Sequence, residues 1–169
     1  MATTGRIVQL SVSAGGVPKR AVGRARVTRL GLEGDAHQNE KHHGGPERAV
    51  CLFSLETIRA LAAEGHAIVP GAIGENVTTE GIEWAAVVPD AYLLLGEHVL
   101  LQVTRYTTPC FKIAPVFRGR ESDRVSQKRH PGWSRVYARV LVEGQLRNDD
   151  SVRIVSELEA AELGVAVTP

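Results

Sequence analysis

The sequence lacks the long apolar runs that mark a membrane span or a secretory signal. No stretch approaches the roughly 18 apolar residues of a spanning helix, and the N-terminus, MATTGRIVQLSVSAGG, has no apolar block of signal-peptide length. The hydrophobic fraction of 43% and the charged fraction of 23% are typical of a soluble globular protein. We therefore expect a soluble, cytoplasmic protein with no membrane partner.

Cysteine is scarce, and neither sign of charge is in excess. Cys51 and Cys110 are too few for a disulfide framework, so each is either a core residue or a reactive thiol. The 20 Lys and Arg against 19 Asp and Glu argue against a dedicated nucleic-acid binder, although a local basic cluster could still hold a phosphate.

The chain of 169 residues has the size of one ordinary domain, and it shows no repeat, low-complexity tract or linker. We expect a single domain over 1–169, with a core of about 5–155 and a short tail or helix over 156–169. Segments with strand patterns recur along it: 6–12, 23–30, 48–53, 97–105, 134–142 and 151–155. Many short strands with few helices predict a mainly β fold, a closed or nearly closed β-barrel.

Finer features of this pattern can be tested against a structure. Alternation over 6–12 predicts an apolar face made by the even-numbered residues. Ser54 predicts a helix N-cap, and Ser156 has capping-box spacing to Glu159. The charged stretch 117–129 predicts a short helix, and the segment 143–144 predicts a turn.

The stretch GLEGDAHQNEKHHGGPE has neither helical nor strand period and predicts a long functional loop. Asp35 with His37, His42 and His43 could ligate a transition metal, but their spacing matches no closed zinc site. Alternatively, the glycines let the backbone approach an anion while a histidine and an arginine donate to it, or they form only a tight turn. The residues of the anion hypothesis are His43, Gly44, Gly45 and Arg48.

Cys110 follows a predicted strand directly, the position from which a barrel presents groups to a ligand. Lys112 and Arg105 could favour its thiolate, which can attack, carry sulfur or bind a metal. The alternative is a buried small hydrophobic residue. Cys51 lies inside the apolar run AVCLF, which favours that core role for it.

Two further segments carry candidate binding residues. GAIGENV contributes Gly74, Glu75 and Asn76, which could equally form a structural turn. In HPGWSRVYAR, alternation places Trp133, Arg135, Tyr137 and Arg139 on one strand face. Such a face could clasp an anionic or planar ligand, or it could be a solvated surface with stacked arginines.

Taken together, these segments resemble the MOSC family, named for the C-terminal domain of molybdenum cofactor sulfurase. Four motifs, in order, carry the resemblance: GLEGDAHQNEKHHGGPERAV from Gly31, GAIGENVTTEG from Gly71, VTRYTTPCFKI from Val103 and HPGWSRVYARVLVEG from His130. The chain resembles the short bacterial members with a YTTPC type of motif. It departs from some relatives at Thr107, where they have an arginine, and at Asp149 and Asp150, where the family has a Gly-Asp turn.

The resemblance implies a MOSC-type barrel with a bound molybdenum cofactor. Cys110 matches the family's cysteine, which ligates molybdenum or carries sulfur as a persulfide. An anionic pterin phosphate would need cationic and backbone donors. The implied cofactor-binding residues are Asp35, His43, Gly44, Gly45, Arg48, Gly74, Glu75, Asn76, Arg135 and Arg139. A stand-alone domain lacks the PLP-dependent part of the large sulfurases, so no PLP site is expected.

The resemblance leaves three functions open. The leading hypothesis is a molybdenum-cofactor protein that supports reduction of N-hydroxylated compounds with a redox partner, or sulfur transfer. The second is a persulfide carrier without cofactor, loaded by a cysteine desulfurase. The third is a non-catalytic module that holds a molybdopterin-type ligand for a partner.

Overall fold

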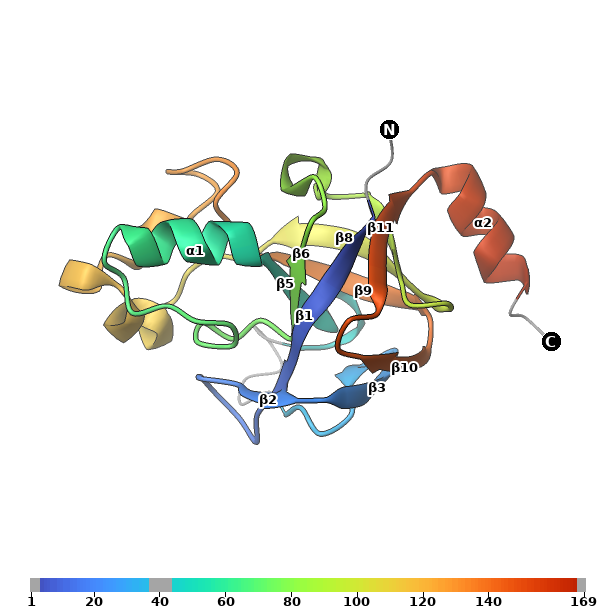
Figure 1. Ribbon diagram of the computed structural model, residues 1–169, viewed down its shortest axis with the longest axis horizontal. Helices are drawn as coiled ribbons and strands as arrows, with labels where there is room; N and C mark the ends of the chain where they lie inside the picture. Colours follow the sequence, from blue (N-terminus) through green and yellow to red (C-terminus); the bar gives the residue numbers. More distant parts are fainter. Residues whose placement is uncertain (1–3, 37–43, 167–169) are drawn as a thin grey trace.

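The computed structural model describes residues 4–36 and 44–166, with side chains up to residue 164. Eleven strands and two α-helices lie within these ranges (Figure 1). The strands are β1 (Gly5–Val12), β2 (Arg20–Val22), β3 (Arg24–Thr28), β4 (Gly31–Leu32), β5 (Val50–Ser54), β6 (Val77–Glu80), β7 (Tyr92–Leu95), β8 (Val99–Tyr106), β9 (Val136–Val142), β10 (Gly144–Arg147) and β11 (Ser151–Val155). The helices are α1 (Leu55–Ala63) and α2 (Glu157–Ala166), with short 3-10 helices η1 (Pro46–Arg48), η2 (Trp84–Ala86), η3 (Phe111–Val116), η4 (Arg118–Arg120) and η5 (Ser122–Val125).

Seven strands close into a barrel. They follow the order β11-β7-β8-β9-β5-β6-β1, and β1 pairs back onto β11 to complete the circle. The β5–β6 pair is parallel, whereas the other neighbours in the barrel are antiparallel. Strand β2 extends β1 outside the closed circle, and β10, β3 and β4 form a separate small sheet. The predicted mainly β, closed barrel is confirmed.

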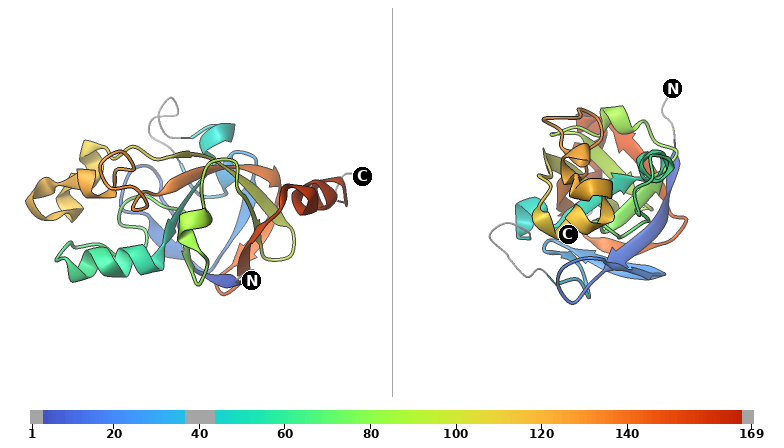
Figure 2. Two further views of the ribbon diagram at one scale, coloured as in Figure 1. Left: turned by 90° about the horizontal axis from the view of Figure 1, so that it is seen from above. Right: turned by 90° about the vertical axis from the view of Figure 1, so that its left-hand side faces the viewer.

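The barrel interior is filled by apolar side chains from every barrel strand, and two further cores lie outside it. One packs α1 and η3 onto the outer face of β5, through Phe53, Leu61 and Ile113. The other packs α2 onto β7 and β8 through Ala160. Figures 1 and 2 show α1 with η3, η4 and η5 at one end of the barrel and α2 at the other.

The predicted alternation of β1 holds for Leu10 and Val12, which lie in the barrel core, but fails at Val8, because a β-bulge interrupts the strand. Ile7 pairs with Thr79, but Gln9 pairs with Thr78, so the register shifts between Ile7 and Gln9. A bulge inserts one extra residue and reverses the inward face after it. Ile7 and Leu10 are therefore both fully buried, and Val8 is only half-buried.

Both predicted helix N-caps are present. The Ser54 hydroxyl accepts a hydrogen bond from the Thr57 amide at 3.2 Å, and Ser156 accepts one from the Glu159 amide at 3.1 Å. The reciprocal half of the capping box is replaced, because the Glu159 carboxylate pairs with Arg153.

Two other local predictions need correction. The stretch 117–129 forms no α-helix but the short η4 and η5, because Gly119 has a φ of 64° and interrupts helical geometry. Gly144 begins β10, where the expected turn would lie, and pairs with Val27 of β3.

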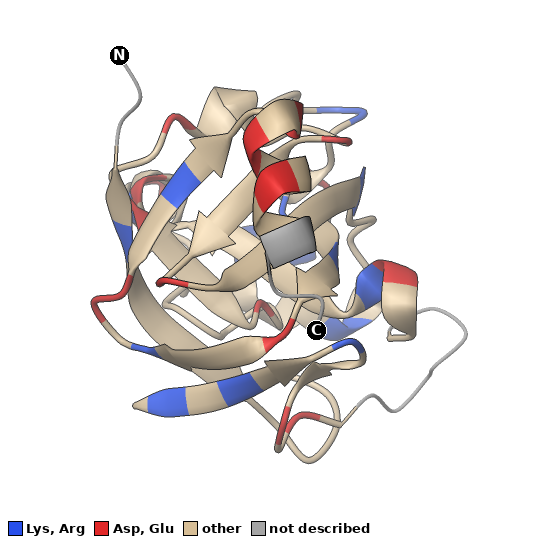
Figure 3. Ribbon diagram, turned by 90° about the vertical axis from the view of Figure 1, so that its right-hand side faces the viewer, with Lys and Arg blue, Asp and Glu red and all other residues tan. Residues whose placement is uncertain are grey.

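The surface carries both signs of charge, as the near-neutral balance requires. Figure 3 shows acidic residues on α2 and basic residues on β3. No helix in the described ranges is long and apolar enough to span a membrane.

Candidate functional site

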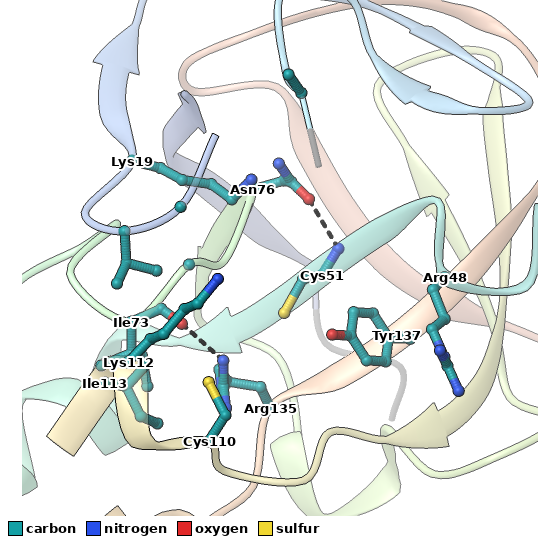
Figure 4. Close-up of a pocket in the computed structure, with 14 residues that line it drawn as sticks. Lys19, Arg48, Cys51, Ile73, Asn76, Cys110, Lys112, Ile113, Arg135 and Tyr137 are labelled. Carbon is teal, nitrogen blue, oxygen red and sulfur yellow. Dashed lines mark hydrogen bonds between the residues drawn. The ribbon is translucent and has the colours of Figure 1, made fainter. Parts of the chain in front are cut away.

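A cavity lies against the outer wall of the barrel, where β5 and β9 face the loop that contains Gly16 and Lys19 and the start of η3 (Figure 4). The empty space between its walls, with the open mouth included, is about 630 Å³. The polar wall consists of two thiols, four cations, an amide and a phenol: Cys51, Cys110, Lys19, Arg48, Lys112, Arg135, Asn76 and Tyr137.

Strand alternation explains why this wall lies outside the barrel. Val50 and Leu52 point into the barrel core, so Cys51 between them points outward. Cys51 lies directly opposite Tyr137 in the antiparallel β5–β9 pair, and directly opposed side chains share a face. Cys51 is buried, as its apolar context predicts, yet it also lines the cavity, a role that the sequence did not reveal.

Cys110 enters the cavity from the connection between β8 and η3. It is half-buried, and its carbonyl oxygen accepts a hydrogen bond from the Ile113 amide. Lys112, two residues on, lines the same cavity. Arg105, the other cation named for this thiol, is exposed on β8 and does not belong to the described cavity wall.

Positive charge dominates the wall. Lys19, Arg48, Lys112 and Arg135 line it, and no Asp or Glu does among the residues that the structure describes. Arg135 is more enclosed than Arg48, with 6% of its surface exposed. Its Nη1 donates a hydrogen bond to the Ile73 carbonyl at 2.6 Å. The chemistry that this wall can offer is anion binding beside a thiol.

Asp35 lies behind the wall and holds Lys19 in place. Both carboxylate oxygens accept from the Lys19 amino group, at 2.6 and 2.8 Å, and one also accepts from the Ser13 amide. The pair is almost completely buried, with 8% and 1% of the two side chains exposed. Sequence reasoning named Asp35 but missed Lys19, whose only signal is its place after the AGGVP turn.

Asn76 joins three segments through its side chain and backbone. Its amide oxygen accepts from the Cys51 backbone N–H at 3.0 Å, and its amide nitrogen donates to the Ser11 carbonyl and to Asp35. Its own backbone N–H donates to the Cys51 carbonyl. The residue therefore fixes the position of Cys51, and it also lines the cavity.

Glu75 is fully buried beside this arrangement. Neither carboxylate oxygen completes a hydrogen bond, although the amides of Glu75, Gly71 and Ile73 lie near enough to favour the charged form. Burial raises the pKa of the Glu75 carboxyl from 4.5 to about 7, and the nearby Arg135 charge partly opposes this rise. Glu75 lies behind the cavity wall and does not line it.

The glycines and the last arginine have separate positions. Gly74 lines the cavity at a φ of 94°, and a Cβ there would lie 3.1 Å from Val17, so glycine lets the two loops pack closely. Gly44 and Gly45 precede η1 and, in the part of the chain that is described, stay off the cavity wall. Arg139 pairs with Glu47 at 3.0 Å on the outer surface, away from the wall.

The predicted face of 133–139 is therefore divided. Arg135 and Tyr137 line the cavity, whereas Trp133 packs against the Arg124 guanidinium, which lies 3.8 Å from the ring centre. His43, with the metal hypothesis for His37 and His42, lies outside the described residues. Within those residues no three His, Cys, Asp or Glu side chains gather to hold a metal ion.

Asn76→Ala is expected to lower the free energy of unfolding by about 3 kcal/mol, because it leaves buried backbone groups of Cys51 and Ser11 without partners. Urea unfolding followed by circular dichroism measures this change. Asn148→Ala, at an exposed position, is the matched control and should change stability little. Equal stability of the two variants would refute the role assigned to Asn76.

Comparison with known proteins gives concordant matches. The MOSC domain profile matches residues 39–153. Protein YiiM of Escherichia coli is 31% identical over 141 residues, which cover 80% of this chain and 61% of that protein. The crystal structure of YiiM from the same species superposes with a TM-score of 0.65 at 26% identity, covering 90% of this chain and 70% of that one. A protein named Reductase from Gibberella moniliformis is 33% identical over 131 residues, which cover 74% of this chain and 22% of that protein.

Proposed function

Since the chain belongs to the MOSC domain family, we propose that it binds a molybdenum cofactor in the cavity, with the Cys110 thiolate against the metal. The single observation that carries this proposal is the composition of the wall. A half-buried thiol shares the wall with four cationic side chains, and no carboxylate lines the described part of the wall.

This donor set fits the cofactor. A thiolate is a soft ligand suited to molybdenum, and guanidinium and ammonium groups suit an anionic pterin phosphate. Lys112 and Arg135 lie on the same side of the cavity as Cys110 in Figure 4. Asp35 and Asn76 act indirectly, because they position Lys19 and Cys51.

When bound, the cofactor would supply redox chemistry, such as reduction of N-hydroxylated compounds with a redox partner. The similarity to a protein named Reductase supports this direction. The chain's own residues would bind and orient the group. Arg135 offers a positive charge at a fixed position, because its guanidinium donates to the Ile73 carbonyl. Lys112 offers a positive charge on a flexible side chain.

Lys112→Ala is expected to lower cofactor retention about tenfold, since a charge-assisted contact contributes about 1.5 kcal/mol or more. The measurement is molybdenum and pterin content per chain after purification from a molybdate-fed, cofactor-competent host. Lys128→Ala removes the same side chain at an exposed position off the wall and should retain the wild-type content. An equal loss in both variants would show that retention depends on overall charge and not on this wall.

A second candidate function is sulfur carriage by Cys110 without cofactor. The favouring observation is the cationic surroundings of this thiol, because they also stabilise a persulfide anion. Incubation with a cysteine desulfurase should then add the mass of one sulfur atom at Cys110. If no sulfur is added, this candidate is excluded.

A further inference from the structure

The cavity holds a second thiol that the proposed function does not use. Cys51 and Cys110 are both free, and they reach the same space from β5 and from the start of η3. Figure 4 shows both sulfur atoms on side chains that point into this space. Tyr137 lies directly opposite Cys51 in the β5–β9 pair and lines the same cavity.

The two thiols differ in chemistry. Burial raises the pKa of the Cys51 thiol to about 12, so it remains protonated at neutral pH. Cys110 is half-buried and open to small reagents through the cavity mouth. A small oxidant would therefore meet Cys110 first.

They also differ in how the fold holds their backbones. The Cys51 backbone is held on both sides, by its ladder with β9 and by the two hydrogen bonds to Asn76. Residues 107–110 have no regular secondary structure. A disulfide needs the two Cα atoms within about 7 Å of each other, and any shift that brings them together has to come from the segment at Cys110, because Cys51 belongs to the sheet.

We propose that Cys51 is the resolving thiol for Cys110, and that the two form a reversible disulfide when hydrogen peroxide oxidises Cys110. The Cys110 thiolate attacks the peroxide oxygen, and the O–O bond breaks to give a sulfenic acid and hydroxide. The Cys51 sulfur then attacks the Cys110 sulfur, the S–O bond breaks, and the departing hydroxide takes the Cys51 proton to form water. The two thiols lose two electrons to the peroxide in total, and a dithiol reductant returns them.

The disulfide would occupy the Cys110 sulfur, which the proposed function assigns to molybdenum. The regulatory consequence therefore rests on the proposed function, whereas formation of the disulfide does not. Oxidation would close the site reversibly. It would also protect Cys110 from the irreversible sulfinic and sulfonic states.

The test uses the full chain, reduced and free of cofactor, exposed to hydrogen peroxide at low protein concentration. Wild type should lose two hydrogen atoms in mass, yield a Cys51–Cys110 linked peptide under non-reducing digestion and recover both thiols with dithiothreitol. Cys51→Ala should instead gain two or three oxygen atoms on Cys110. Cys110→Ala should keep Cys51 as a thiol over the same period.

Two outcomes would overturn the inference: the same oxygen gain on Cys110 in wild type as in Cys51→Ala, or a Cys110 that peroxide does not oxidise. Circular dichroism shows whether the Cys51→Ala variant is folded. If it is not, the linked peptide in wild type still shows whether the two cysteines form a disulfide. The peroxide test contains no cofactor, so its result and the molybdenum measurement are independent. A missing Cys51–Cys110 peptide would not count against cofactor binding, and a missing cofactor would not count against the disulfide.

Discussion

Cys110→Ala is expected to abolish molybdenum retention, lowering the metal content per chain by far more than tenfold. The physical reason is that Cys110 is the soft ligand that the wall offers from an open, half-buried position, while Cys51 remains protonated behind it. Because its side chain is half-buried, its loss should cost only about 1 kcal/mol of stability.

Metal analysis and circular dichroism together measure this result. Thr108→Ala is the matched control, since Thr108 is exposed two residues away and outside the cavity wall. It should keep the wild-type molybdenum content. If the folded Cys110→Ala variant retains molybdenum in full, Cys110 is not a ligand of the metal.

Glu75→Gln is expected to abolish a large pH dependence of stability. The carboxyl has a raised pKa of about 7 in the fold, against 4.5 ordinarily. Below pH 4.5 it is protonated in both states, so folding is not penalised. Between pH 4.5 and 7 the unfolded chain ionises while the folded chain does not, so the free energy of unfolding falls as pH rises. At about 1.4 kcal/mol per pH unit, the wild type should lose about 3 kcal/mol relative to the variant across this range.

Urea unfolding of both proteins at intervals from pH 4.5 to 8.5 measures the difference. It should grow up to about pH 7 and then stay constant. Glu83→Gln, at an exposed position, controls for the loss of one negative charge. A difference between wild type and Glu75→Gln that does not vary with pH would mean that the buried carboxyl ionises as freely as in the unfolded chain.

Sequence patterns predicted the barrel because its strands obey local rules. The alternation of β8 and β9 and the Ser54 cap depend on neighbouring residues alone, and these features are present. The bulge in β1 depends on its pairing with β6, a contact between distant segments, so the local pattern placed Val8 on the inward face where the structure has Ile7.

The cavity was only partly predictable for the same reason. Cys110, Arg135 and Arg48 were identified from their motifs, and all three lie in the wall. Lys19 and Cys51 could be recognised as cavity residues only from the structure, in which their loop and strand lie beside the start of η3. Their own sequence contexts, a turn and an apolar run, indicate nothing unusual.

Arg139 shows the opposite limit. Strand alternation places it on the same face as Tyr137, but the cavity does not extend that far, and Glu47 from η1 pairs with it. Glu75 was expected to bind cofactor, and the fold buries it near Arg135, whose charge acts on the pKa of its carboxyl, without placing it in the lining of the cavity.

The most direct test of the account is the molybdenum and pterin content of the wild-type chain, purified from a molybdate-fed, cofactor-competent host. The account predicts molybdenum and pterin in near-equimolar amounts with the protein. A folded chain that carries neither would contradict it.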